Sequence, residues 1–215
     1  MTGIKPRRRG GTSFTTRLAM LSAATGVLRR SLTASEFLGV LGRFARSPKA
    51  ATWSALPPPA DEKDRGSRDQ LGDALRIHEA LLARVDRDRA LGITREIVKA
   101  AAIAFLRGTL PVVSRQAIAR MDVKERQALL EEIAAAFPNS DGRVVAVSPD
   151  EFTFAVTRCR FTELLGRVGH PELAGAFCSG DLEYFQRFQP DIEASRDTTL
   201  ANGDACCGFS FRLKH

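Results

Sequence analysis

The chain has 215 residues, of which 44% are hydrophobic and 27% charged. This composition is ordinary for a soluble globular protein and allows a buried core without disulfide or metal staples. Four cysteines are too few for a secreted disulfide scaffold, so we expect reduced thiols and a cytoplasmic location. The formal net charge is +7, but residues 1–50 hold ten basic residues and one acid, and the other 165 residues hold 22 basic and 24 acidic ones.

The positive charge therefore belongs to an N-terminal arm, which lacks the features of a nucleic-acid-binding motif. No nucleic-acid-binding motif follows the arm, so we expect no nucleic-acid partner; the arm is the part of the chain that would contact an anionic partner. Arg7-Arg8-Arg9 before the apolar run 18–28 only loosely resembles a twin-arginine export signal. The run is shorter than the roughly 20 apolar residues that span a bilayer and ends at Arg29-Arg30, so it predicts a helix and no transmembrane segment.

The first third of the chain divides into three segments. Residues 1–13 are basic and aperiodic, and we expect a disordered tail. Residues 14–56 are expected to form a basic helical extension, because apolar residues recur there at helical spacing. Three prolines followed by polar residues predict a linker over 57–69, since prolines favour an extended spacer.

Residues 70–215 are expected to form one domain, with helices over 70–137 and a sheet unit over 143–215. Apolar positions follow a helical period up to the break at 138–142, after which the period changes to two. The sheet unit should contain two hairpins and three short helices, with strands at 144–147, 152–156, 191–200 and 205–213 and helices at 160–167, 171–178 and 182–188. This order predicts an α+β fold: a helical N-terminal half, then a four-stranded antiparallel sheet with helices on one face.

The last strand carries two adjacent cysteines that period-two alternation separates. Cys207 shares its parity with Phe209 and Phe211, whereas Cys206 falls on the opposite face. Cys207 is therefore the one that would line a sheltered pocket or, in the plainer interpretation, be a small buried hydrophobe.

Cys178 and Asp181 lie three residues apart near a predicted helix boundary. Asp181 is placed to cap the helix 182–188. The functional interpretation is that both face one cavity, where Asp181 moves a proton and Cys178 attacks an electrophilic carbon.

Metal and phosphate sites find little support in the pattern. The spacings of Cys159, His170, Cys178 and Cys207 match no common zinc pattern, so we expect no metal ion. His78 lies on a helical stripe and is expected to be packed or capping. Phosphate-loop, α/β-hydrolase and zincin motifs do not occur in the sequence.

An ordered set of residues from Cys159 onward resembles the L-2-amino-thiazoline-4-carboxylic acid hydrolase family, over roughly residues 95–215. The set consists of Cys159-x9-Gly169-x-Pro171-Glu172-Leu173, Cys178-x-x-Asp181 and Arg196-x-x-x-Leu200-Ala201-x-Gly203-x-x-x-Cys207-x-Phe209. The family's activity opens a thiazoline ring by adding water at the carbon between nitrogen and sulfur.

The resemblance implies roles for six residues. Cys178, Asp181 and Cys207 would be catalytic, Arg196 would hold the substrate carboxylate with its bidentate fork, and His170 and Cys159 would contact substrate. The chain departs from the pattern at Gly208, where family members often carry an acidic residue.

We therefore expect a hydrolase acting on a C–N (or C–S) bond of a small cyclic amidine or amide, without a cofactor. The alternative is a non-enzymatic small-ligand-binding or sensor domain of the vinyl-reductase-like type. A homo-oligomer is compatible with either interpretation.

Overall fold

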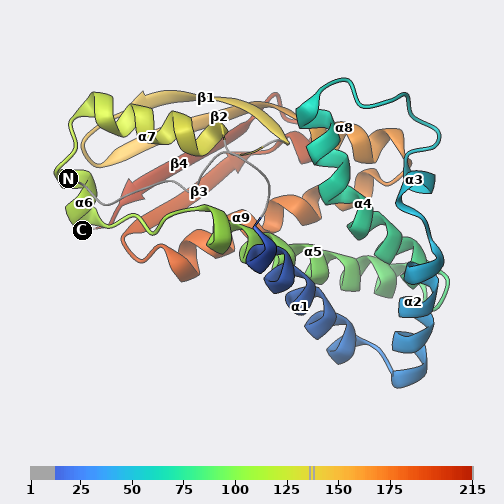
Figure 1. The fold of residues 1–215 in the computed structure, drawn as a ribbon. Helices are drawn as coiled ribbons and strands as arrows, with labels where there is room; N and C mark the ends of the chain where they lie inside the picture. Colours follow the sequence, from blue (N-terminus) through green and yellow to red (C-terminus); the bar gives the residue numbers. More distant parts are fainter. Residues whose placement is uncertain (1–12, 136, 138, 215) are drawn as a thin grey trace.

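The computed structural model describes residues 13–135, 137 and 139–214, so the predicted disordered tail lies almost entirely outside the described residues. A helical layer precedes a mixed C-terminal half (Figure 1). The helices are α1 (Phe14–Ser31), α2 (Ala34–Arg46), α3 (Lys49–Thr52), α4 (Glu62–Leu82), α5 (Arg87–Thr109), α6 (Arg115–Ala119), α7 (Val123–Ala135), α8 (Arg160–Arg167) and α9 (Ala174–Phe188), with 3-10 turns at Pro171–Leu173 and Leu200–Asn202. The strands are β1 (Ser140–Val147), β2 (Glu151–Cys159), β3 (Ile192–Thr198) and β4 (Cys207–Leu213).

The four strands form one antiparallel sheet in the order β1-β2-β4-β3. The sheet and its helices confirm the predicted α+β class. Side chains from β2, β3 and β4 form an apolar cluster with Phe185 of α9 and Ile118 of α6, so these helices cover the aromatic face of the sheet. The β3–β4 connection, residues 199–206, is longer than the gap between the two predicted strands, because it contains a 3-10 turn. Gly203 follows that turn with a φ of 92°, which suits a residue without Cβ.

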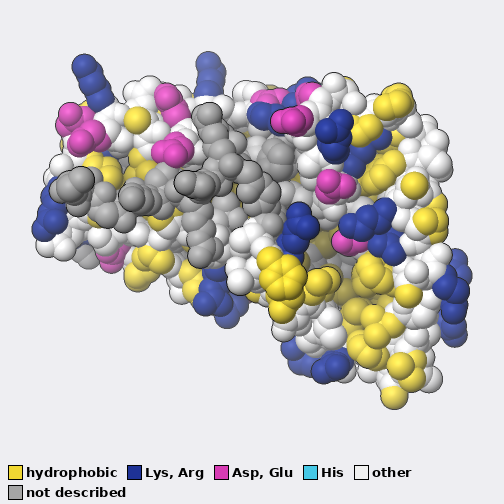
Figure 2. All heavy atoms as spheres, in the orientation of Figure 1, with side chains coloured by type: hydrophobic (Ala, Val, Ile, Leu, Met, Phe, Trp, Pro, Cys, Tyr) yellow, Lys and Arg dark blue, Asp and Glu magenta, His cyan; other side chains and the backbone are white. Residues whose placement is uncertain are grey.

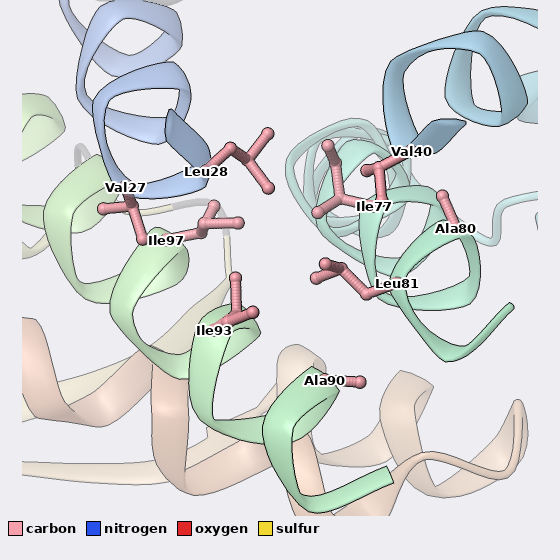
Figure 3. Close-up of a cluster of buried hydrophobic side chains, with 9 residues drawn as sticks. All are labelled: Val27, Leu28, Val40, Ile77, Ala80, Leu81, Ala90, Ile93 and Ile97. Carbon is pink, nitrogen blue, oxygen red and sulfur yellow. The ribbon is translucent and has the colours of Figure 1, made fainter. Parts of the chain in front are cut away.

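The basic helices α1 and α2 pack into the same core as α4 and α5. Val27 and Leu28 from α1 and Val40 from α2 meet Leu81 and Ile97 in one buried cluster (Figure 3). A capping box at the start of α2 places Glu36, which also pairs with Arg89 of α5 at 2.7 Å. The segment predicted as an extension therefore shares its buried core with the helices that follow it.

One side of this helical layer is apolar and exposed. Phe14, Leu18 and Leu21 on α1 are 76%, 53% and 60% exposed, and Leu38 on α2 is 68% exposed. Figure 2 shows hydrophobic side chains interspersed with basic side chains over the part of the surface where α1 and α2 lie. In the described part of the chain, no helix is long and apolar enough to cross a membrane.

The predicted linker is shorter than expected, because α4 begins at Glu62 and not near Gln70. Asp61 caps the helix by accepting a hydrogen bond from the Asp64 backbone N–H. Arg68 is buried and donates to the Asp64 carboxylate and to the Pro57 carbonyl. The polar residues of this stretch are thus satisfied within a helix, so the prediction of a linker over the whole of 57–69 was wrong for its second half.

The prediction of two separate helices over 171–178 and 182–188 was also wrong, because α9 runs unbroken from Ala174 to Phe188. Gly180 lies against α5, where a Cβ would be 2.8 Å from the Ala102 Cβ. The Ser179 hydroxyl donates to the Ala176 carbonyl within the helix. Asp181 therefore lies inside a helix and caps nothing, which removes the structural role that the sequence suggested for it.

Candidate functional site

Four of the six predicted site residues come together where α9 crosses the β3–β4 connection. Cys178 and Asp181 are one helical turn apart on α9, Arg196 lies on β3, and Cys207 is the first residue of β4. Cys207 is 6% exposed, as strand parity predicted. Three successive elements, α9, β3 and β4, thus supply two thiols, a carboxyl group and a guanidinium to one place.

Arg196 holds the α9 residues in position. Its Nη1 donates to the Cys178 carbonyl oxygen at 3.1 Å and lies 3.5 Å from Oδ2 of Asp181. The guanidinium also stacks over the Phe209 ring at 5.4 Å from its centroid, and the side chain is only 13% exposed. The positive charge is therefore fixed beside Asp181 by contacts on two sides.

Thr199 links the two thiols, a role that the sequence analysis did not anticipate. Its hydroxyl lies 4.0 Å from Sγ of Cys178 as donor and 3.6 Å from Sγ of Cys207 as acceptor. The Leu200 backbone N–H donates to Sγ of Cys207 at 3.3 Å. A hydrogen-bonded path therefore runs from Cys207 through Thr199 to Cys178. The sequence offered one signal for Thr199, a hydroxyl residue directly before the Leu200-Ala201 pair. Only the fold of the β3–β4 connection places this hydroxyl between the two sulfur atoms.

The Cys178 thiol is kept protonated by its surroundings. Burial and the neighbouring Asp181 carboxylate raise its pKa from 9.0 to about 11, against the opposing effect of Arg196. The hydrogen bond from Thr199 also favours the thiolate but is a smaller effect. Arg196 by itself lowers the pKa of Cys178 and favours the thiolate, but burial outweighs this effect.

The Asp181 carboxyl has its pKa raised from 3.8 to about 6, because burial outweighs the attraction of the Arg196 guanidinium. Its side chain is nevertheless 34% exposed, which leaves an approach for water or a small substrate. A carboxyl group with a pKa close to neutral can accept and return a proton during one reaction cycle. Asp181 thus has the properties of an acid–base residue.

Of the two remaining predicted site residues, one lies near the cluster and one elsewhere. Cys159 ends β2 and is close enough to Cys178 to contribute to its raised pKa. His170 lies before the 3-10 turn at Pro171–Leu173, where its ring contacts His78 edge-on with centroids 5.3 Å apart. His170 therefore belongs to a second group of polar residues, with partners different from those of the cysteines.

A cavity of about 630 Å³ adjoins His170 and not the cysteine cluster. Residues of α2, α3 and α4 form most of its wall, and the buried Nε of Arg76 lacks a hydrogen-bond partner among the described residues. Its charged lining residues are Arg43, Arg46, Arg76, Glu79 and Arg84. The cavity is therefore predominantly basic.

Comparison with known proteins supports one family. The family described as L-2-amino-thiazoline-4-carboxylic acid hydrolase matches residues 75–211, well over half of the chain and all of the cysteine cluster. Among solved structures, a doubly substituted Tt H-NOX protein aligns over 92% of this chain and 94% of its own, with 14% identity and a TM-score of 0.33, a level of likeness that carries no argument. No curated protein matches the chain. From the extent of the family match, the chain belongs to the L-2-amino-thiazoline-4-carboxylic acid hydrolase family.

Proposed function

We propose that the protein is a hydrolase that opens a small cyclic amidine or amide by cleaving a C–N (or C–S) bond, with its active site at the Cys178–Asp181 cluster. The observation that carries the proposal is the Asp181 carboxyl group, which lies beside the partly buried Cys178 thiol and the fixed Arg196 guanidinium and has its pKa raised to about 6. Family membership supports the reaction class. The ring substrate itself is inferred from the family's description.

The chemistry requires one group that takes a proton from the nucleophile and returns it to the leaving atom. At pH 7 a carboxyl group with a pKa of about 6 is roughly nine-tenths ionised and can accept that proton. The nucleophile then adds to the amidine carbon, and the ring C–N bond breaks as the proton passes from Asp181 to the departing nitrogen. The net change is the addition of one water molecule.

Two nucleophiles fit this scheme. In the first, the Cys178 thiol transfers its proton to Asp181 as sulfur attacks, and water later releases the thioester-like or thioimidate-like intermediate. In the second, Asp181 activates water directly and Cys178 only shapes the site. A pKa of about 11 makes a preformed thiolate scarce at neutral pH, so the first route needs proton transfer coupled to attack.

We assign Arg196 a positioning role, because its Nη1 already contacts Asp181 and the Cys178 carbonyl. Among the described residues, Nη1 makes both side-chain hydrogen bonds of Arg196. Nε and Nη2 are therefore the donors with which Arg196 would hold a substrate carboxylate, the role that the family resemblance implies. Cys207 and Thr199 are assigned to the hydrogen-bonded path that orients Cys178.

A turnover assay with 2-amino-thiazoline-4-carboxylate and a panel of cyclic amidines and lactams tests the proposal. The wild type should show kcat/KM falling as the pH drops below about 6, because protonated Asp181 cannot act as the base. Asp181→Asn should lose activity by roughly 100-fold or more, the usual contribution of a general acid–base residue. Asp197→Asn, an exposed charge change on β3, serves as the matched control.

The Cys178→Ser variant distinguishes the two nucleophiles. Activity that survives this substitution indicates that water is the attacking group, whereas complete loss with an intact fold indicates the thiol. An Asp181→Asn variant with full activity and an unchanged pH profile contradicts the proposal. Saturable binding of the panel without turnover by the wild type points instead to the ligand-binding alternative.

A further inference from the structure

A second cluster of chemically active side chains lies between α4 and the turn that leads into α9. His78 belongs to α4, and His170 and Glu172 flank Pro171 at the start of the 3-10 turn. One potential ligand atom from each of these three residues lies within 4.8 Å of the others. Two imidazoles and a carboxylate at this separation are a set that zinc and similar divalent transition metals accept.

The hydrogen bonds of His78 determine its tautomer. Its Nδ1 lies 2.8 Å from the Thr94 hydroxyl, which itself donates to the Ala90 carbonyl at 2.8 Å. A hydroxyl has one proton to donate, so the Thr94 oxygen must be the acceptor and Nδ1 of His78 the donor. Nε2 of His78 is therefore left with a lone pair, and it has no hydrogen-bond partner among the described residues.

The contacts of His170 make Nδ1 the ring nitrogen that is available to a metal ion. Its Nε2 lies 2.8 Å from Oε1 of Glu79, and its Nδ1 lies 3.4 Å from Oε1 of Glu172. A carboxylate that accepts the N–H of one ring nitrogen orients the other nitrogen toward a metal, as in many metal centres. Nδ1 of His170 would thus face the same ion as the Glu172 carboxylate.

We propose that His78 Nε2, His170 Nδ1 and the Glu172 carboxylate bind a divalent transition metal ion, with Zn²⁺ as the best match for two imidazoles and one carboxylate. Thr94 and Glu79 orient the two imidazoles through their outer nitrogens. Three protein ligands leave at least one coordination position for water or a substrate atom. The site adjoins the basic cavity, since His170 and Glu79 both line it.

The proposal differs from the expectation of a metal-free protein, because that expectation considered His170 only with the cysteines.

Titration of the chelator-treated full-length protein with Zn²⁺, in competition with a chromogenic chelator, tests the site. We expect one equivalent to bind, and Co²⁺ to give visible bands typical of low coordination without a sulfur charge-transfer band. His170→Ala and Glu172→Gln should each weaken binding by about 100-fold or more, and Glu79→Gln by roughly 10- to 100-fold, the range found for groups that orient metal ligands.

Two variants serve as controls. Glu193→Gln removes an exposed carboxylate on β3, and Cys178→Ser removes a thiol of the other cluster; neither should change Zn²⁺ affinity. Circular dichroism verifies that each variant is folded. A wild-type dissociation constant above about 10 µM, or affinities unchanged in both His170→Ala and Glu172→Gln, overturns the proposal and leaves an ordinary packed histidine pair. Because this readout is metal binding, it succeeds or fails independently of the turnover test at Cys178.

Discussion

The reactivity of Cys178 provides a quantitative check on the candidate site. Its pKa of about 11 lies two units above the ordinary 9.0, so at neutral pH the thiolate fraction is about 100-fold below that of an unburied cysteine. Alkylation proceeds through the thiolate. The native protein should therefore react with iodoacetamide at Cys178 about 100-fold more slowly than the same chain in denaturant.

Mass spectrometry can follow this one thiol. Trypsin cleavage after Arg167 and Arg187 releases residues 168–187, which contain Cys178 as their only cysteine. The labelled fraction of this peptide, measured against time between pH 7 and pH 10, gives the rate. The denatured chain supplies the reference rate with the identical sequence around the sulfur.

Substitution of Asp181 should accelerate the reaction. Asp181→Asn removes a negative charge that raises the pKa of Cys178 and leaves Arg196, which lowers it. Burial remains, so the rate should lie between those of the native wild type and the denatured chain. Asp197→Asn should leave the rate unchanged. Wild-type labelling as fast as in the denatured chain, or an Asp181→Asn rate equal to the wild type, would refute the reasoning about this pair.

Two further predictions concern stability, and urea denaturation measures both. Leu28→Ala should lower the free energy of unfolding by about 2–5 kcal/mol, because Leu28 is 2% exposed in the core that α1 shares with α4 and α5. The control Leu38→Ala, at a position 68% exposed, should change it by less than about 0.5 kcal/mol. Equal effects of the two substitutions would contradict a shared core. Gly180→Ala should destabilise the protein by about 1–3 kcal/mol, because the new Cβ would lie 2.8 Å from the Ala102 Cβ at the α5–α9 contact. The control is Gly175→Ala in the same helix, where a Cβ meets nothing within 4 Å. Similar losses of stability in both variants would contradict the tight contact.

The sequence alone was sufficient for the features that depend on local periodicity. The change from helical to alternating spacing predicted the four strands and the α+β class, because the apolar period reports which face of each element is buried. Parity on the last strand separated Cys207 from Cys206 for the same reason. The order of Cys159, Cys178, Asp181, Arg196 and Cys207 also carried the family resemblance, because motif order is itself a property of the chain.

Boundaries that depend on tertiary partners were missed. The polar stretch after the prolines is helical because Arg68 is buried against Asp64 and Pro57, and spacing does not reveal such partners. The Ser179-Gly180-Asp181 segment has the composition of a helix break, yet α9 continues through it because Gly180 fits against α5. Close packing of two helices thus overrode the local preference.

The tertiary structure alone decided which chemical groups meet. Asp181 becomes a candidate acid–base residue because burial between α9 and β3 raises its pKa beside Arg196, and Thr199 reaches the two thiols through the bend of the β3–β4 connection. His170 was grouped with the cysteines by proximity in sequence, but the fold places it with His78, 92 residues away along the chain. The pairing of distant residues follows from the packing of whole elements, which local periodicity does not encode.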